Sequence, residues 1–379
     1  MAQPQPRILF ATGGSGGHIS PALAIAEQLQ QRGFSINFIG YGGAFTTLIT
    51  ERGFTFTKIP AAKWNVRNPL RKLWALLVLA WALLRAFYLI YKESPAVVVG
   101  AGGYASVAAV LAAKILGVPT VVHEQNVMPG RANRFLFRWV DKILLSFEET
   151  RQHVPIPSDQ SVVTGNPVRD IIYTTAQQPE VDDGFYRIFV TGGSQAARLF
   201  SEVVPSSLAL LPAAVRHKLR VVHQARAEDL GRLKEAYLRA EIVAEIKTFF
   251  TDLPQQLHRC QLYIARAGAS TITEAIIMGR VQILIPGLFA DGHQIYNARA
   301  LADRNAAVMI HEEVLTPALL ADHVLELLTK PALRAAYQQE LARLVPTVRA
   351  ATMAAEVIAH MAQTDLLHLL EAHPDAPPR

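Results

Sequence analysis

The chain has 379 residues, of which 51% are hydrophobic and 18% are charged, and its formal net charge is +6. This length suits two domains of ordinary size, and the apolar content excludes a disordered chain. The single cysteine, Cys260, excludes an internal disulfide and a cysteine-rich zinc site, so we predict a buried thiol in a reducing compartment. A basic protein can bind nucleic acid, an anionic membrane or a phosphorylated ligand. No long basic run, zinc-finger pattern or RNP-like pattern occurs, so nucleic acid is not an expected partner.

Short β-like runs alternate with helical patterns along the chain. In the first half, strands are expected at residues 8–11, 35–39, 55–59, 97–100, 120–123 and 142–145, with helices at 21–31, 104–116 and 131–139. A second series of strands is expected at 187–191, 219–222, 246–250, 262–265 and 282–285, followed by helices from 317 to about 370. This alternation predicts an α/β fold with parallel sheets.

The two halves begin alike, with a strand that enters a glycine-rich turn and then a helix. Gly13 and Gly192 lie 179 residues apart in these turns, nearly half the chain. We therefore expect two Rossmann-like domains that face each other across a cleft. The expected boundaries are an N-terminal domain at 1–169, a polar linker at 170–185, a C-terminal domain at 186–350, and a final helix with a disordered tail at 351–379.

Four glycine turns share one geometry, a strand end followed by a helix start. They lie at residues 12–18, 100–104, 191–195 and 266–270. Glycine allows close backbone approach, and a helix N-terminus offers N–H groups and a positive dipole end to an anion. Each turn alone could serve only to reverse the chain, but four of them suit two diphosphate-bearing ligands.

A dinucleotide cofactor is the obvious rival for the first turn. That turn does not fit G-x-G-x-x-G, because Ile19 stands where the third glycine belongs. The second strand ends in residues 40–43, Gly-Tyr-Gly-Gly, so no carboxylate is present there to hold a ribose. We therefore predict no nicotinamide cofactor.

Two side chains beside these turns are suited to chemistry. His18 closes the first turn, where an imidazole could take a proton from a hydroxyl, or could instead bind phosphate or cap the turn. Glu274 shares a helix face with Ser270 and Thr271, so its carboxylate could accept both hydroxyls of a ribose, or could be a solvated surface group. No metal-ligand pattern occurs, and no metal is expected.

An apolar segment at residues 73–91 contains one charge, Arg85. As a helix it would span about 28 Å, close to a bilayer core of about 30 Å. A transmembrane helix is disfavoured because it would place the strands on either side of it across the membrane from each other; a buried core helix is the other alternative. We predict a helix that lies on an anionic lipid surface, because Trp74, Trp81 and Tyr88 form one stripe among basic residues. The residues expected to meet the lipid are Trp74, Leu77, Val78, Trp81 and Arg85.

Seven motifs in fixed order resemble the MurG family of glycosyltransferases. They are residues 13–18 (GGSGGH), 102–104 (GGY), 123–126 (HEQN), 165–169 (GNPVR), 192–195 (GGSQ), 266–274 (RAGASTITE) and 291–294 (DGHQ). The resemblance runs from about Arg7 to at least Leu328. It implies a GT-B fold with the active site between two Rossmann-like domains, and an inverting hexosyltransferase. That enzyme would move N-acetylglucosamine from UDP-GlcNAc to the C4 hydroxyl of the muramoyl sugar of lipid I, an undecaprenyl-diphosphate-linked muramoyl peptide, and so form lipid II for peptidoglycan.

The resemblance also implies roles for individual residues. His18 would be the catalytic base. The residues implied to bind the donor are Ser15, Gly16, Gly17, Asn126, Arg169, Ser194, Phe250, Ala269, Ser270, Thr271, Ile272, Thr273, Glu274 and Gln294. The residues implied to hold the acceptor diphosphate are Gly13, Gly14, Gly102, Gly103 and Tyr104. No cofactor is implied. The protein is expected at the cytoplasmic face of the bacterial inner membrane, as a peripheral protein that binds the membrane through its N-terminal, acceptor-binding domain.

Two residues depart from the family pattern. His293 stands where a first glutamine usually precedes Gln294, and Ala196 stands where a glycine usually follows the 192–195 motif. His293 affects one expected contact with the sugar, and Ala196 affects the turn expected to hold the phosphates. Two other functions remain possible: a lipid glycosyltransferase of the same fold that acts on diacylglycerol, and a nonenzymatic sensor of sugar nucleotides at the membrane.

Overall fold

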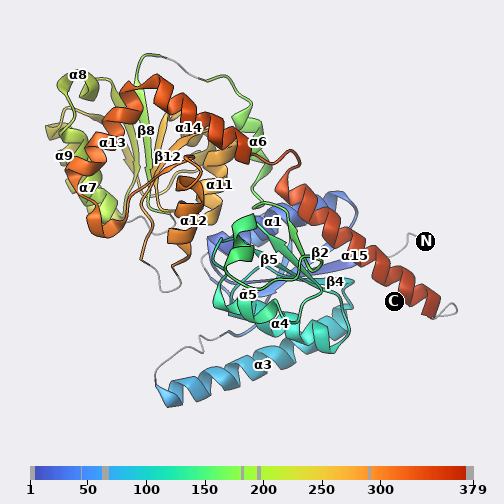
Figure 1. Cartoon of the computed structure of the whole chain (residues 1–379). Helices are drawn as coiled ribbons and strands as arrows, with labels where there is room; N and C mark the ends of the chain where they lie inside the picture. Colours follow the sequence, from blue (N-terminus) through green and yellow to red (C-terminus); the bar gives the residue numbers. More distant parts are fainter. Residues whose placement is uncertain are drawn as a thin grey trace. The chain divides into compact units, whose positions relative to one another are not determined.

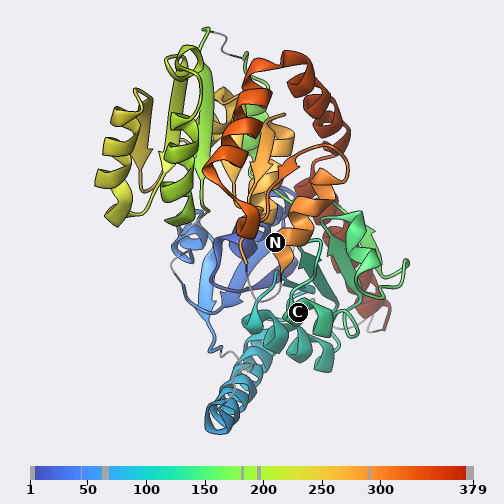
Figure 2. The ribbon, with the colours of Figure 1, turned by 60° about the vertical axis from the view of Figure 1, so that its left-hand side comes forward.

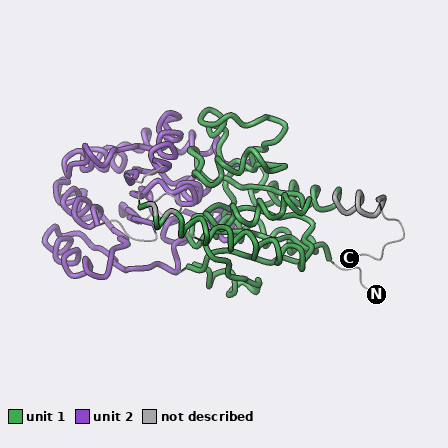
Figure 3. Tube along the Cα trace, turned by 90° about the horizontal axis from the view of Figure 1, so that it is seen from below, with its two compact units in different colours: residues 1–169, 347–379 green, residues 170–346 purple. Residues whose placement is uncertain are grey.

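The computed structural model of the chain consists of two compact units, which are coloured separately in Figure 3: residues 1–169 with 347–379, and residues 170–346. The structure describes residues 5–43, 45–61, 68–180, 183–193, 198–288 and 292–372, with the side chains of Pro69, Lys72 and residues 365–372 excepted.

The first unit is built on a seven-stranded parallel sheet of order β3-β2-β1-β4-β5-β6-β7. Its strands are β1 (Arg7–Thr12), β2 (Ser35–Gly40), β3 (Thr55–Lys58), β4 (Val97–Gly100), β5 (Thr120–Glu124), β6 (Lys142–Leu145) and β7 (Ser161–Val163). Its helices are α1 (Gly16–Gln31), α2 (Thr47–Glu51), α3 (Pro69–Glu93), α4 (Tyr104–Ile115), α5 (Arg131–Leu136), the 3-10 turn η1 (Glu148–Gln152) and α15 (Ala350–Ala372).

Alternate residues of β1 build the two sides of this sheet. Ile8 and Phe10 pack against α1 and α15, whereas Leu9 and Ala11 pack against α3 and α4. Because successive side chains of a strand point to opposite faces, a strand covered on both faces reads as one apolar run. Figure 1 shows these helices on either side of the strands.

The helix α3 touches its unit along a narrow seam. Ala75, Ala82, Ala86 and Ile90 are buried, while most of its large apolar side chains are exposed. Its last residue, Glu93, is fixed to the sheet, because Asn37 Nδ2 donates to Glu93 Oε2 over 2.7 Å. In Figure 2 one end of α3 extends past the strands and helices of its own unit.

The second unit has a six-stranded parallel sheet of order β10-β9-β8-β11-β12-β13. Its strands are β8 (Tyr186–Thr191), β9 (Leu219–Gln224), β10 (Val243–Lys247), β11 (Leu262–Ala265), β12 (Val281–Leu284) and β13 (Val308–Met309). Its helices are α6 (Asp170–Ala176), α7 (Arg198–Ala209), α8 (Ala213–Arg216), α9 (Leu230–Arg239), α10 (Leu253–Arg259), α11 (Ala269–Ile277), α12 (His293–Ala302), α13 (Pro317–Thr329) and α14 (Pro331–Leu344), with 3-10 turns η2 (Ala227–Asp229) and η3 (Glu312–Val314). Ile188 and Val190 pack beneath α7, α9 and α13, and Phe189 on the opposite face stacks on Tyr263.

Two Rossmann-like units with parallel sheets confirm the predicted fold class, and several element boundaries differ from the prediction. Helix α1 begins at Gly16 rather than near residue 21, so Pro21 lies inside it. Strand β10 covers Val243–Lys247 rather than residues 246–250, and β7 and β13 were not predicted.

The chain also divides differently from the boundaries expected from the sequence. Residues 170–185 were predicted to be a linker, but residues 170–176 form α6, which packs on α10 and α11 of the second unit. The last helix, α15, belongs to the first unit, because Ala354, Ala355 and Ile358 pack in the same core as Ile8 and α1. The tail predicted to be disordered lies, from residue 373 on, outside the described residues.

Candidate functional site

The first glycine turn brings Ser15 and His18 together at the start of α1. Ser15 is the N-cap residue, and its carbonyl accepts from the backbone N–H groups of His18 and Ile19. Its Oγ lies 3.0 Å from His18 Nδ1. This contact engages Nδ1 and thereby helps to fix the orientation of the ring. The first turn of α1 contains no acidic residue, so its N–H groups and the helix dipole favour an anion.

The turn after β4 lies against the first turn. Gly13 N donates to Gly102 O over 2.9 Å. Gly102 and Gly103 have φ values of +100° and +84°, and a Cβ at Gly102 would lie 2.8 Å from His18 Cδ2. Only glycine combines this backbone conformation with this approach, so the His18 ring rests on a surface without side chains. Tyr104 follows as the first, half-buried residue of α4.

The end of β5 carries a buried polar cluster. His123 Nδ1 lies 3.1 Å from Gln125 Nε2, and His123 Nε2 lies 3.2 Å from Ser146 Oγ. Because Gln125 Nε2 can only donate, Nδ1 accepts and the proton lies on Nε2. Burial, followed by the charge of His18, lowers the pKa of His123 to about 3, so this imidazole is neutral.

Glu124 holds the loop that follows β5. The carboxylate is buried, and it accepts from Asn126 N (2.9 Å), Asn126 Nδ2 (3.1 Å), Gly130 N (3.2 Å) and Asn133 Nδ2 (2.8 Å). Burial raises the pKa of Glu124, while these four hydrogen bonds oppose that shift. Asn126, expected to contact the donor, is thus fixed by its own neighbour. Glu124 and Asn133 were not among the predicted site residues, although a carboxylate in a buried strand is a signal of a structural or functional role.

In the second unit, the start of α11 is fixed by Arg266. Its Nη1 donates to Ile285 O (3.0 Å) and pairs with Glu312 Oε2 (2.8 Å). Gly268 is the N-cap residue, and Ser270 Oγ is buried with no hydrogen-bond partner in the described part of the chain. A buried hydroxyl without a partner at a helix N-terminus suits a ligand oxygen.

The other residues predicted for the donor lie around this helix start. Glu274 is 9% exposed, so it is not the solvated surface group considered as the alternative. Gln294, in the first turn of α12, accepts from Gly287 N over 2.9 Å through its Oε1, and Asn297 Nδ2 ties α12 to Ala267 O. The buried Phe250 packs edge-on against Phe189, with ring centroids 5.7 Å apart.

The predicted acceptor and base residues therefore lie together in the first unit, and the α11 residues lie together in the second. Arg169 is half-buried at the end of the first unit. Ser194 and Ala196 lie outside the described residues, so the 191–195 turn is described only to Gly193. Within the described ranges, no three His, Cys, Asp or Glu side chains gather as a metal site.

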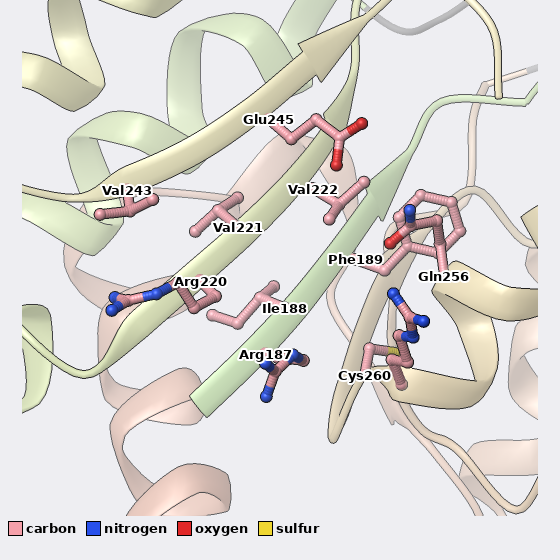
Figure 4. Close-up of a pocket in the computed structure, with 11 residues that line it drawn as sticks. Arg187, Ile188, Phe189, Arg220, Val221, Val222, Val243, Glu245, Gln256 and Cys260 are labelled. Atoms are coloured by element: carbon pink, nitrogen blue, oxygen red, sulfur yellow. The ribbon is translucent and has the colours of Figure 1, made fainter. Parts of the chain in front are cut away.

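A separate cavity of about 240 Å³ lies in the second unit (Figure 4). Ile188, Val221 and Cys260 are among its apolar walls, and Arg187 and Arg220 are among its charged residues. It contains none of the residues predicted for the site. Arg187 lies near the amino end of β8, and ligands of open α/β sheets bind at the opposite, carboxyl ends.

The exposed face of α3 agrees with the helix predicted to contact lipid. Trp74 and Trp81 are 67% and 59% exposed, Leu77 and Arg85 are exposed, and Val78 is half-buried, so a buried core helix is the wrong alternative. Residues 73–93 are long and apolar enough to cross a membrane. However, β3 and β4 on either side of α3 belong to one sheet, which a spanning helix would divide.

Comparison with known proteins agrees with this arrangement. Residues 8–145 match the N-terminal domain of glycosyltransferase family 28, and residues 187–354 match its C-terminal domain. The UDP-N-acetylglucosamine–N-acetylmuramyl-(pentapeptide) pyrophosphoryl-undecaprenol N-acetylglucosamine transferase of Paramagnetospirillum magneticum is 40% identical over 341 residues, covering 87% of this chain and 90% of that protein. The protein of the same name from a Methylobacterium species is 41% identical over 313 residues, covering 81% and 84%.

Among solved structures, MurG of Acinetobacter baumannii superposes with a TM-score of 0.76 at 26% sequence identity, covering 94% of this chain and all of that one. Both domains of the family are thus matched in order, over most of the chain and with the same two-sheet architecture. The chain belongs to glycosyltransferase family 28, among the UDP-N-acetylglucosamine-dependent MurG glycosyltransferases.

Proposed function

We propose that this protein transfers N-acetylglucosamine from UDP-GlcNAc to the C4 hydroxyl of the muramoyl sugar of lipid I and so forms lipid II. The observation that carries the proposal is the pair of helix starts just described. One, at α1, presents His18 beside an anion-binding turn, and the other, at α11, offers an unpartnered Ser270 hydroxyl above a buried Glu274. Relatives that carry the name of this reaction match 87% and 81% of the chain.

His18 is the base of the proposed reaction. The C4 oxygen of the acceptor attacks the anomeric carbon of the donor, the bond from that carbon to the UDP oxygen breaks, and configuration inverts. The hydroxyl proton moves to His18 Nε2, and Nδ1 carries its own proton toward Ser15 Oγ. Gly13, Gly14, Gly102, Gly103 and Tyr104 hold the acceptor diphosphate through the turns of β1 and β4.

The proposed donor contacts of the second unit gather at the start of α11. The start of α11, residues 269–273, takes the diphosphate, whose negative charge grows as UDP departs; the N–H groups and dipole of the helix stabilise that charge. Glu274 accepts the ribose hydroxyls, the backbone at Phe250 reads the uracil, and Gln294 binds the sugar. Ser15, Gly16, Gly17, Asn126, Arg169 and Ser194 complete the donor contacts.

The protein binds the cytoplasmic face of the bacterial inner membrane through α3. Trp74, Leu77, Val78 and Trp81 enter the interface between lipid heads and tails, and Arg85 meets anionic head groups. This placement brings a soluble nucleotide sugar and a lipid-anchored acceptor to one enzyme.

One experiment tests the activity directly. The protein is incubated with labelled UDP-GlcNAc and a lipid I analogue, with and without a chelator, and labelled lipid is extracted. Label in a disaccharide lipid supports the proposal. Label transferred only to diacylglycerol supports the related lipid glycosyltransferase, and tight UDP-GlcNAc binding without any transfer supports the sensor.

A further inference from the structure

Three glycine-rich loops lie side by side over the carboxyl ends of β2, β1 and β4. The turns of β1 and β4 touch through the hydrogen bond from Gly13 N to Gly102 O. The loop after β2 touches the first turn from the other side, since a Cβ at Gly14 would lie 3.1 Å from Gly43 Cα. Together they form a continuous floor of backbone that extends beyond the two turns assigned to the acceptor diphosphate.

The two ends of this floor differ in the part of the chain that the structure describes. On the β5 side of β4, hydrogen bonds hold the loop after β5 in place. Gln125 Nε2 donates to Ala101 O over 3.1 Å, and the Glu124 carboxylate accepts from the backbone N–H groups of Asn126 and Gly130 in that loop. Past β1, the edge continues over β2 to β3, as the strand order places them. An acceptor with its diphosphate over the turns of β1 and β4 can therefore extend its remaining part toward β2 and β3.

Tyr41 and Lys58 lie at the carboxyl ends of β2 and β3. Tyr41 directly follows β2 and is 52% exposed. Lys58 is the last residue of β3, and its side chain lies along the loop, because a Cβ at Gly42 would be 3.1 Å from Lys58 Cε.

The Lys58 ammonium is available to an anion. No carboxylate in the described ranges pairs with it, whereas Lys114 and Lys247 each pair with a carboxylate over 2.5 Å. An exposed cation whose side chain lies along Gly42, the residue after an exposed tyrosine, suits a peptide that carries both carboxylates and apolar groups.

We propose that Tyr41 and Lys58 form a subsite for the peptide of the acceptor. The Lys58 ammonium binds a peptide carboxylate, and the Tyr41 ring covers the adjoining apolar part. The inference rests on the proposed function, since it assumes a muramoyl peptide acceptor. It adds a specificity contact that the resemblance does not assign.

The test compares two acceptors that differ only in the peptide. Both are short-chain polyprenyl diphosphates of N-acetylmuramic acid; one carries the full pentapeptide, and the other has its lactyl carboxyl capped as a neutral methylamide. Loss of one charge-assisted contact should raise KM for the pentapeptide acceptor, relative to KM for the capped acceptor, about 10-fold in Lys58→Met. Tyr41→Ala should move the same ratio in the same direction, and Lys58→Arg should restore most of it.

Lys142→Met is the matched control, because Lys142 begins β6 and so lies at the amino end of a strand, on the other side of β1 from β3. Its KM ratio should equal that of the wild type. An unchanged ratio in Lys58→Met, including equal increases in KM for both acceptors, overturns the peptide subsite. If wild-type protein glycosylates neither acceptor, the proposed function itself has failed, which is a different outcome.

Discussion

Ser15 Oγ lies 3.0 Å from His18 Nδ1, within a single turn at the start of α1. The contact engages Nδ1 and orients the ring, and orientation determines whether an imidazole can serve as a base. The ring itself is seated by Gly102, where a side chain would collide with it.

His18→Ala should therefore lower kcat by about 10²- to 10⁴-fold, the usual contribution of a general base. Binding of UDP-GlcNAc, measured by calorimetry, should persist, because the proposed diphosphate site is at α11, away from His18 in the sequence. Ser15→Ala should lower kcat less, since it removes orientation and leaves the base. Wild-type turnover in His18→Ala would remove the base role.

Glu124→Gln should reduce both stability and activity. All four hydrogen bonds to this carboxylate come from N–H donors. The NH2 group of a glutamine cannot accept them, so the donors that bind one of the two oxygens would lose their acceptor. A buried group left unsatisfied costs about 1–3 kcal/mol, and Asn126 and Gly130 would shift with the loop. Thermal unfolding and kcat/KM would measure the two effects. A variant with the wild-type midpoint and rate would show that the loop does not depend on this carboxylate.

Glu274→Ala should weaken UDP itself and not only UDP-GlcNAc. Losing two hydroxyl contacts to a carboxylate corresponds to about 10- to 100-fold in Kd. Calorimetry with UDP measures the change, and Glu235→Ala, on the exposed surface of α9, is the control. Equal UDP affinity in Glu274→Ala and wild type would contradict the ribose role.

Each unit should lose stability in acid because of one buried histidine. Burial lowers the pKa of His123 and of His223 to about 3, against an ordinary value of about 6.5 in the unfolded chain. Between these values the unfolded chain binds the proton and the folded chain does not, so stability falls as pH falls, by about 1.4 kcal/mol per pH unit for each histidine.

For the second unit, His223→Gln should flatten this dependence in urea unfolding between about pH 6 and pH 4. His311→Gln, at an exposed position, should leave the slope unchanged. A slope in His223→Gln equal to that of the wild type would mean that other groups cause the acid loss.

Trp74→Glu combined with Trp81→Glu should reduce sedimentation with anionic vesicles, because both exposed rings of α3 would become charged. The circular dichroism spectrum should be unchanged, since neither ring is buried. Leu238→Glu with Phe249→Glu places the same charges at equally exposed apolar residues of the second unit and should leave vesicle binding intact. Full binding by the α3 variant would exclude this helix as the main lipid contact.

The amino-acid sequence by itself determined the two parallel sheets and the four glycine turns. Apolar runs such as Ile8–Ala11 are continuous because both faces of the strand are covered, and glycine is required where backbone must touch backbone, as at Gly102. These requirements act on neighbouring residues, so short sequence patterns show them. The boundaries that failed depended on distant contacts. Helix α1 begins at Gly16 although Pro21 suggested a later start, and β10 lies three residues earlier in the sequence than the expected strand at 246–250.

Only the tertiary structure decided which distant groups meet. It placed Gly102 against His18, gave the buried Glu124 its four donors, and returned α15 to the first unit by packing Ala354 and Ala355 on the core around Ile8. It also left the tryptophans of α3 exposed. The apolar sequence of this segment had left a buried core helix open as an alternative. The physical reason is that burial and hydrogen bonding depend on what the rest of the chain brings near, whereas backbone conformation and side-chain periodicity depend on neighbours in sequence.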